Sequence, residues 1–123
     1  MKFFVTGVNG QLGHDVMNEL HSRGHEGVGS DIQDVYSGVA DGTAVTTMPY
    51  VKLDITDANA VREVISNVKP DAVIHCAAWT AVDLAEEKED LVRKVNVDGT
   101  ANIANVCKEL DCNIGDVVDY VPQ

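Results

Sequence analysis

The sequence has 123 residues, 45% of them hydrophobic and 24% charged, which is the composition of one ordinary globular domain with a single core. Its 20 acidic and 9 basic residues give a formal net charge of −11, which repels nucleic acid and anionic membranes, so we expect neither as a partner. No apolar stretch is long enough to span a bilayer and no signal peptide opens the sequence, which favours a cytoplasmic protein.

The first predicted elements are a strand, a helix and a second strand. Residues 2–6 (KFFVT) are a short apolar run that ends at glycine. From residue 10 to about 23, apolar side chains recur as on one face of a helix, and Gly24 is placed to end it. Residues 26–31 (EGVGSD) then predict the second strand, although two glycines interrupt its pattern.

Residues 32–49 show no clear period, and a stretch of that length within a domain is usually functional or mobile. A third strand is predicted at residues 50–54 (YVKLD). The apolar spacing that follows predicts a helix, which Thr56 or Asp57 can cap and which ends before Pro70.

The last predicted elements are a buried strand, a long helix and a tail. Residues 71–77 (DAVIHCA) are almost continuously apolar, as in a strand covered on both faces. A helical pattern runs from about residue 83 to 110, with a break expected near residues 98–99. Residues 113–123 could add a fifth strand, although a glycine and an aspartate within them are poor strand residues.

Strands that alternate with helices predict an α/β fold, a doubly wound, Rossmann-like parallel sheet of four to five strands with helices on both faces. Right-handed crossovers give the strand order 3-2-1-4, with a fifth strand beside the fourth. We assign residues 1–112 to this Rossmann domain and residues 113–123 to an altered C-terminal tail.

A glycine-rich loop lies between the first strand and the first helix. Gly7 can take the tight turn, Gly10 lets backbone approach a pyrophosphate, and Gly13 allows close packing of the helix. Free N–H groups and the dipole at the helix start favour phosphate. No Lys-Ser/Thr pair follows, so the loop is not a Walker motif. The alternative is a structural turn that binds no ligand.

The second predicted strand ends at Asp31. A carboxylate at this position can accept hydrogen bonds from the ribose hydroxyls of an adenosine, and it would repel a 2′-phosphate. No Arg or Lys occurs between Gly24 and Lys52 to attract such a phosphate. We therefore expect NAD as the cofactor, with NADP as the less favoured dinucleotide.

Four segments together resemble the extended short-chain dehydrogenase/reductases, and among them the reductases that act on nucleotide sugars. The segments are TGVNGQLG (6–13), LDITD (53–57), AVIHCAAWTAVDLAEE (72–87) and VNVDGTANIA (95–104). This combination is far more specific than the glycines alone, and the similarity extends over residues 1–112.

The resemblance implies a cofactor site along the ends of the strands. Gly7, Asn9, Gly10, Gln11, Leu12 and Gly13 would form the cofactor loop, Asp31 would meet the adenosine ribose, Asp54 and Ile55 would flank the adenine, Ala77, Ala78 and Thr80 would lie along the ribose and diphosphate, and Asn96 would match the family's asparagine in the following helix. Structural alternatives are close helix–sheet packing for the alanines, a helix cap for Asp54 and a bond within its own helix for Asn96.

The resemblance stops at the catalytic residues. The family's reductive chemistry needs a hydroxyl-bearing residue after the fifth strand and a Tyr-x-x-x-Lys pair on the next helix. None of Tyr36, Tyr50 and Tyr120 has a lysine four residues later. We therefore expect the N-terminal, cofactor-binding part of such a reductase, ended early and inactive alone. The alternatives are a Rossmann scaffold with no tight ligand and a chain whose partner supplies the missing half.

The predicted fourth strand is apolar on both faces and would lie at or near an edge of this truncated sheet. An uncovered apolar edge pairs readily with another chain. Either residues 114–121 cover it or a second copy does, and we expect a homo-oligomer joined near this edge.

Overall fold

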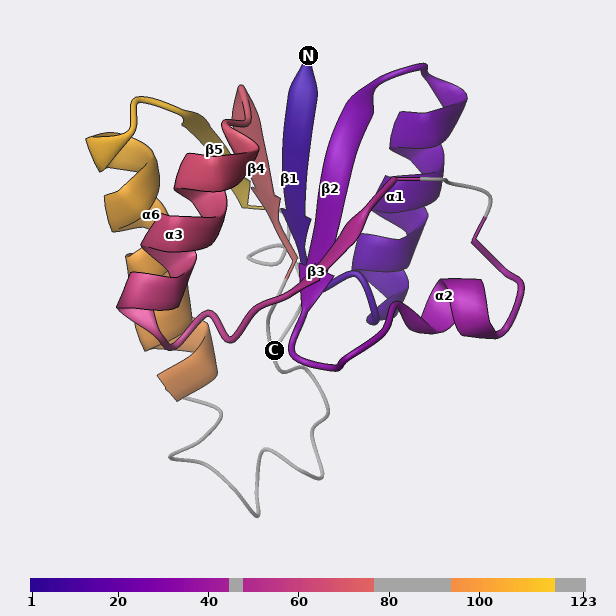
Figure 1. Cartoon of the computed structure of the whole chain (residues 1–123), viewed down its shortest axis with the longest axis horizontal. Helices are drawn as coiled ribbons and strands as arrows, with labels where there is room; N and C mark the ends of the chain where they lie inside the picture. The colour runs from indigo at the N-terminus through magenta and orange to yellow at the C-terminus, as the bar shows by residue number, and fades with distance from the viewer. Residues whose placement is uncertain (45–47, 77–93, 117–123) are drawn as a thin grey trace.

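Five parallel strands form one sheet in the order β3-β2-β1-β4-β5 (Figure 1). The computed structural model of the chain describes residues 1–44, 48–76 and 94–116. Its elements in chain order are β1 (Lys2–Thr6), α1 (Gln11–Ser22), β2 (Glu26–Asp31), α2 (Ser37–Ala40), β3 (Tyr50–Lys52), α3 (Ala58–Val68), β4 (Ala72–His75), the π-helix η1 (Lys94–Gly99), α6 (Thr100–Glu109) and β5 (Asn113–Asp116). The strand order is the one predicted for a doubly wound sheet.

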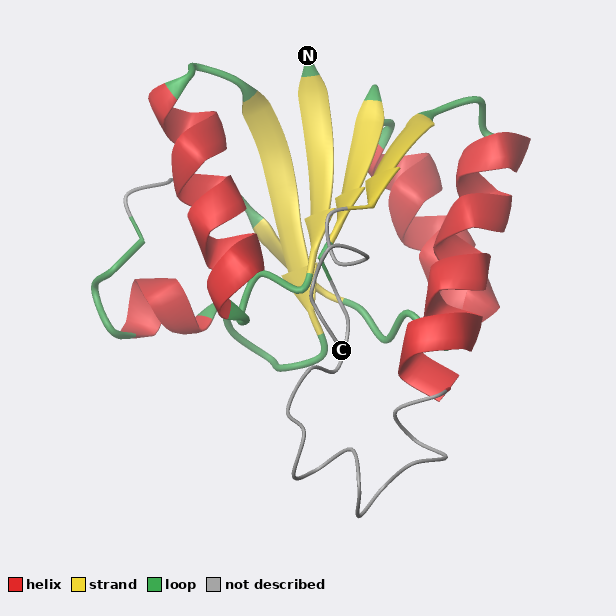
Figure 2. Cartoon of the chain, turned by 180° about the vertical axis from the view of Figure 1, so that it is seen from behind, coloured by secondary structure: helices red, strands yellow, loops and turns green. Residues whose placement is uncertain are grey.

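Helices cover both faces of the sheet. α1 and α2 lie on one side, and α3 and α6 lie on the other (Figures 1 and 2). Phe4 belongs to the apolar cluster under α3 and α6, whereas its neighbour Val5 belongs to the cluster under α1. Successive side chains of β1 therefore enter different cores, as expected for a central strand of a parallel sheet.

The helix boundaries follow local sequence signals. α1 ends at Ser22, and Gly24 follows with a φ of +76°, a conformation that glycine adopts without strain. α3 begins after Asp57, whose Oδ1 accepts hydrogen bonds from the backbone N–H groups of Asn59 and Ala60, each at 3.1 Å. Of the two predicted caps, Asp57 is therefore the one the helix uses.

One helix of the structure, α2, was not predicted. The segment without a sequence period contains α2, whose four residues are too few to display an apolar period. Of the long helix predicted over residues 83–110, residues 83–93 lie outside the described residues, and η1 passes into α6 at residues 99–100, next to the expected break. None of the helices in the described ranges is long and apolar enough to cross a membrane.

The edge of β4 is covered by the chain itself. β5 pairs with β4 from Ala72↔Asn113 to His75↔Asp116. Of the two alternatives, cover by the chain's own C-terminal residues and cover by a second copy, the structure shows the first. Association of copies near this edge of the sheet stays a prediction.

Parallel pairing brings the carboxyl ends of the strands to one edge of the sheet. Thr6 at the end of β1 pairs with Ser30 of β2 and with His75 of β4. Asp31 at the end of β2 pairs with Lys52 of β3. In open α/β sheets, ligands bind in the crevice outside this edge, near the strand where the order reverses.

Candidate functional site

The loop between β1 and α1 is a tight turn that requires two of its glycines. Gly7 has a φ of +74°, and its carbonyl oxygen accepts a hydrogen bond from the Gly10 N–H at 3.1 Å. A Cβ atom on Gly13 would lie 2.2 Å from that oxygen and 2.8 Å from the Cα of Val8. The first turn of α1 therefore rests directly on the loop, and no larger residue fits at position 13 without moving backbone.

The start of α1 offers backbone donors to an anion. Gly10 is the N-cap, no side chain in the described ranges caps the helix, and its first turn holds no acidic residue. Both Gly10 and Gln11 are exposed. The uncapped N–H groups and the positive end of the helix dipole together make a site that fits a phosphate. A Cβ on Gly10 would meet only an ordinary contact of 3.4 Å, so the fold itself does not require glycine there.

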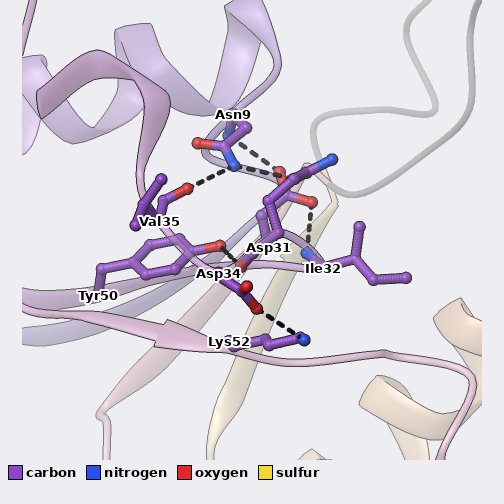
Figure 3. A network of polar contacts seen from close by, with 8 residues as sticks. Asn9, Asp31, Ile32, Asp34, Val35, Tyr50 and Lys52 are labelled. Carbon is purple, nitrogen blue, oxygen red and sulfur yellow. Dashed lines mark hydrogen bonds and ion pairs between the residues drawn. The ribbon is translucent and has the colours of Figure 1, made fainter. Parts of the chain in front are cut away.

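Asn9 ties this loop to the connection that follows β2. Its backbone N–H donates to Oδ2 of Asp31 at 2.9 Å, and its side-chain amide donates to the Val35 carbonyl at 3.1 Å (Figure 3). The same amide donates to Gln33 Oε1 at 2.8 Å, while its oxygen accepts from the Ser37 N–H at 2.7 Å. One asparagine thus fixes the distance between the glycine loop and the end of β2.

Asp31 is half-buried and held by two backbone donors. Oδ2 accepts from Asn9, and Oδ1 accepts from the N–H of Ile32 at 2.8 Å (Figure 3). Each carboxylate oxygen has a second lone pair, so the group can still accept hydrogen bonds from a diol. The two backbone N–H groups therefore hold the Asp31 carboxylate in a fixed position next to the glycine loop.

Two tyrosines, Tyr36 and Tyr50, support the connection that follows β2. The rings of Tyr36 and Tyr50 are stacked, with centroids 6.1 Å apart and planes at 15°. The Tyr50 hydroxyl donates to the Gln33 carbonyl at 2.6 Å, and the Tyr36 hydroxyl lies 2.7 Å from His14 Nδ1. Burial, with Asp31 nearby, raises the pKa of Tyr50 to about 12, and burial likewise raises the pKa of Tyr36. Both phenols therefore stay protonated near neutral pH.

The turn after β3 is rigid and attached to α6. Oδ1 of Asp54 accepts from the backbone N–H and the hydroxyl of Thr56, at 3.0 and 2.7 Å. The Ile55 side chain is buried, and a Cβ on Gly99 would lie 2.5 Å from its Cδ1. Asn102 Nδ2 also donates to the Ile55 carbonyl at 2.9 Å. Asp54 thus stabilises a turn rather than capping α3.

A buried polar chain links β1, β4 and α6 beneath the site. His75 is 1% exposed, and its Nδ1 lies 2.7 Å from the Thr6 hydroxyl while its Nε2 lies 2.9 Å from the Thr100 hydroxyl. The Thr6 hydroxyl also accepts from the Cys76 N–H at 3.0 Å. Such a connected set of buried polar groups holds the carboxyl ends of β1 and β4 at a fixed spacing.

The structure gathers the predicted residues only in part. Hydrogen bonds and backbone contacts join the glycine loop, Asn9 and Asp31, and the turn with Asp54 and Ile55 follows the neighbouring strand β3. Asn96 lies in η1. Ala77, Ala78 and Thr80 lie outside the described residues.

A depression of about 350 Å³ opens beside the loop, between α1 and α2. Its lining residues come from the loop, from both helices and from the segment that follows α2: Asn9, Gly10, Gln11, His14, Asp15, Ser37, Gly38, Asp41 and Thr43. The glycine loop therefore borders an open space that is polar and, through its two aspartates, acidic.

Known proteins share both the sequence pattern and the fold. The family model of the RmlD substrate binding domain matches residues 1–121. The chain is 36% identical over 107 residues to the dTDP-4-dehydrorhamnose reductase of Streptomyces griseus, covering 87% of this chain and 29% of that protein.

Two crystal structures show the same similarity in three dimensions. A dTDP-4-dehydrorhamnose reductase from Clostridium acetobutylicum gives a TM-score of 0.72 at 36% identity, over 93% of this chain and 34% of the other. The UDP-glucose 4-epimerase of Thermus thermophilus, in complex with NAD, gives 0.79 at 25% identity over 90% and 35%. The chain thus spans about a third of the length of these proteins.

Proposed function

This chain belongs to the RmlD substrate binding domain family, and we propose that its own role is to bind a nicotinamide dinucleotide, NAD in preference to NADP. The similarity to an epimerase crystallised with NAD supports a dinucleotide of this type. The observation that carries the proposal is the hydrogen bond from the Asn9 N–H to the Asp31 carboxylate. This bond holds the Asp31 carboxylate, whose oxygens are suited to accept hydrogen bonds from ribose hydroxyls, beside the glycine loop, whose N–H groups suit a phosphate.

The described residues fit the chemistry of such a ligand. The N–H groups in the first turn of α1, from Gln11 onward, would hold the pyrophosphate, because no side chain in the described ranges caps this helix. Asp31 would accept the adenosine ribose hydroxyls, and its charge disfavours a 2′-phosphate. The rigid turn at Asp54 and Ile55 would flank the adenine. When bound, a nicotinamide supplies or accepts a hydride.

We further propose that this binding serves the reduction of a nucleotide sugar, the activity named for the reductase relatives, and that the chain alone does not catalyse it. The two tyrosines in the described residues support the second point. Tyr50 donates its hydroxyl to a carbonyl, Tyr36 is buried against His14, and each has a raised pKa. Neither is followed by a lysine four residues later, so neither matches the proton donor of the family.

Cytoplasmic location is part of the same proposal. In the described residues Cys76, Cys107 and Cys112 are thiols rather than disulfides, which suits a reducing compartment.

Calorimetric titration of the full chain with NAD⁺, 5′-AMP and NADP⁺ tests the proposal. We expect NAD⁺ and 5′-AMP to bind and NADP⁺ to bind more weakly, because the phosphate loop and Asp31 both engage the adenosine half. Asp31→Asn should lower the affinity for NAD⁺ and 5′-AMP by about tenfold or more, since a hydrogen bond to a charged acceptor contributes about 1.5–3 kcal/mol.

Asp71→Asn is the matched control. Asp71 also accepts a backbone N–H, from Lys2 at 2.8 Å, but at the amino end of β1, opposite the site. Its substitution removes the same charge and should leave ligand affinity unchanged.

The outcomes separate the competing functions. Absence of heat with all three nucleotides would contradict the proposal and favour a Rossmann scaffold without a tight ligand. Equal losses in the two aspartate variants would show that net charge, rather than Asp31, governs binding.

A further inference from the structure

We propose that the ion pair between Asp34 and Lys52 is a specificity determinant, which withholds a cation from the ribose end of the site and thereby disfavours a 2′-phosphorylated dinucleotide. This inference rests on the proposed function, because it concerns which dinucleotide the same site accepts. It assigns a role to a lysine that is distant from Asp31 in the sequence and adjacent to it in the fold.

Sheet register places Lys52 next to the ribose-binding carboxylate. Lys52 on β3 is the Cα partner of Asp31 on β2, and neighbouring strands lie about 4.8 Å apart. Partner residues of a parallel pair project to the same face of a sheet. A lysine ammonium at this position is therefore within reach of any group that Asp31 contacts. Among the residues described from the end of β2 to the end of β3, Lys52 is the first cation along the chain.

An ion pair with Asp34 occupies the ammonium group of Lys52, so this group is not available to bind a phosphate. Lys52 Nζ lies 2.8 Å from Asp34 Oδ1, in the connection that follows β2 (Figure 3). The hydrogen bond between the two side chains lowers the pKa of Asp34 and raises the pKa of Lys52, so both are charged at neutral pH. Asp31, Asp34 and Lys52 together then carry one net negative charge.

The Asp34–Lys52 pair is exposed to solvent, so it can influence ligand binding without being needed to hold the fold together. The side chains of Lys52 and Asp34 are 61% and 84% exposed, and exposed pairs of this kind contribute little to folding stability. Substitution of either residue should therefore leave the fold intact. Without Asp34, the site would lose a negative charge and Lys52 would become available as a phosphate ligand, a role that lysine commonly fills.

Titrations of 5′-AMP and adenosine 2′,5′-bisphosphate at low ionic strength test the inference, with the affinity ratio as the measured quantity. Asp34→Asn should raise the relative affinity for the bisphosphate about two- to fivefold, the range expected for one exposed charge interaction. The gain should shrink in high salt. Lys52→Gln should shift the ratio the opposite way, and the double variant should lose most of the gain seen with Asp34→Asn.

Glu19→Gln is the control, because it breaks a similar exposed pair, Glu19–Arg23, near the end of α1. It should leave the ratio unchanged. If Asp34→Asn has no effect on the ratio, or if its gain persists in full without Lys52, the inference is wrong while the proposed function stands. If the wild-type chain binds neither nucleotide, both are wrong.

Discussion

The backbone N–H of Asn9 donates a 2.9 Å hydrogen bond to the carboxylate of Asp31, which joins the glycine loop to the end of β2 across a separation of 22 residues in the sequence. This contact makes Asp31 part of the support of the glycine loop, in addition to the ligand-binding role proposed for it. Binding and stability at this position are therefore coupled, and the two can be separated by the choice of substitution.

Asp31→Ala should reduce both the affinity for 5′-AMP and the free energy of unfolding, whereas Asp31→Asn should reduce mainly the affinity. Asparagine keeps one acceptor oxygen for the Asn9 N–H, while alanine leaves that half-buried N–H without this acceptor, at a cost of about 1 kcal/mol or more. Urea unfolding of the two variants measures the difference. Identical stabilities would mean that the Asn9–Asp31 bond contributes nothing measurable to folding.

Gly13→Ala should destabilise the chain by about 1–3 kcal/mol, whereas Gly10→Ala should be tolerated. The added methyl group on residue 13 would lie 2.2 Å from the Gly7 carbonyl oxygen, so α1 must move away from the loop. On residue 10 the same group makes an ordinary 3.4 Å contact, and the backbone φ of −84° suits alanine. Chemical denaturation compares the variants, and equal stabilities would contradict the packing described for Gly13.

His75→Leu should lower the free energy of unfolding by about 2 kcal/mol, because it removes the imidazole between two threonine hydroxyls in a fully buried position. His21→Leu is the control, since His21 is an exposed residue on α1 and such substitutions usually change stability by less than about 0.5 kcal/mol. A His75 variant as stable as the control would show that the Thr6–His75–Thr100 chain is energetically neutral.

The chain should lose stability in alkali through Cys107. Burial, together with the neighbouring Cys112, raises the pKa of the Cys107 thiol to about 12, from an ordinary value of 9.0. Between these values the unfolded chain releases the proton and the folded chain keeps it. The contribution is therefore fully present below about pH 9 and is lost as the pH rises towards 12, with a slope of up to about 1.4 kcal/mol per pH unit.

Urea unfolding at a series of alkaline pH values, with a thiol reductant present, measures this slope. Cys107→Ala should be less stable at neutral pH because it leaves a small cavity in the core, but its stability should decline less steeply in alkali. Parallel declines of the two proteins would show that Cys107 does not ionise differently on unfolding.

The parts of the site that could be predicted from sequence are those with local signals. Gly7, Gly10 and Gly13 follow an apolar run and precede an amphipathic helix, and Asp31 ends the next strand, so a short window suffices to recognise them. The sheet order followed equally from the alternation of elements and the handedness of crossovers.

The remaining parts depend on contacts between distant segments. No Arg or Lys occurs between Gly24 and Lys52 in the sequence, yet the β2–β3 register sets Lys52 directly beside Asp31. The stack of Tyr36 on Tyr50 likewise joins the residue that precedes α2 to β3, across a stretch with no period. No local pattern encodes such pairings, because they arise only when the strands are aligned.

The central place of β1 also determines the order in which the molecule can assemble. As the chain is synthesised, β1 can pair with β2 once residue 31 is available, whereas its other edge must wait for Ala72, the partner of Phe3. Closing so long a loop is the slow part of forming a parallel sheet. The half of the molecule that carries the glycine loop and Asp31 can therefore form first, and β4 followed by β5 then extends the sheet from the opposite edge of β1.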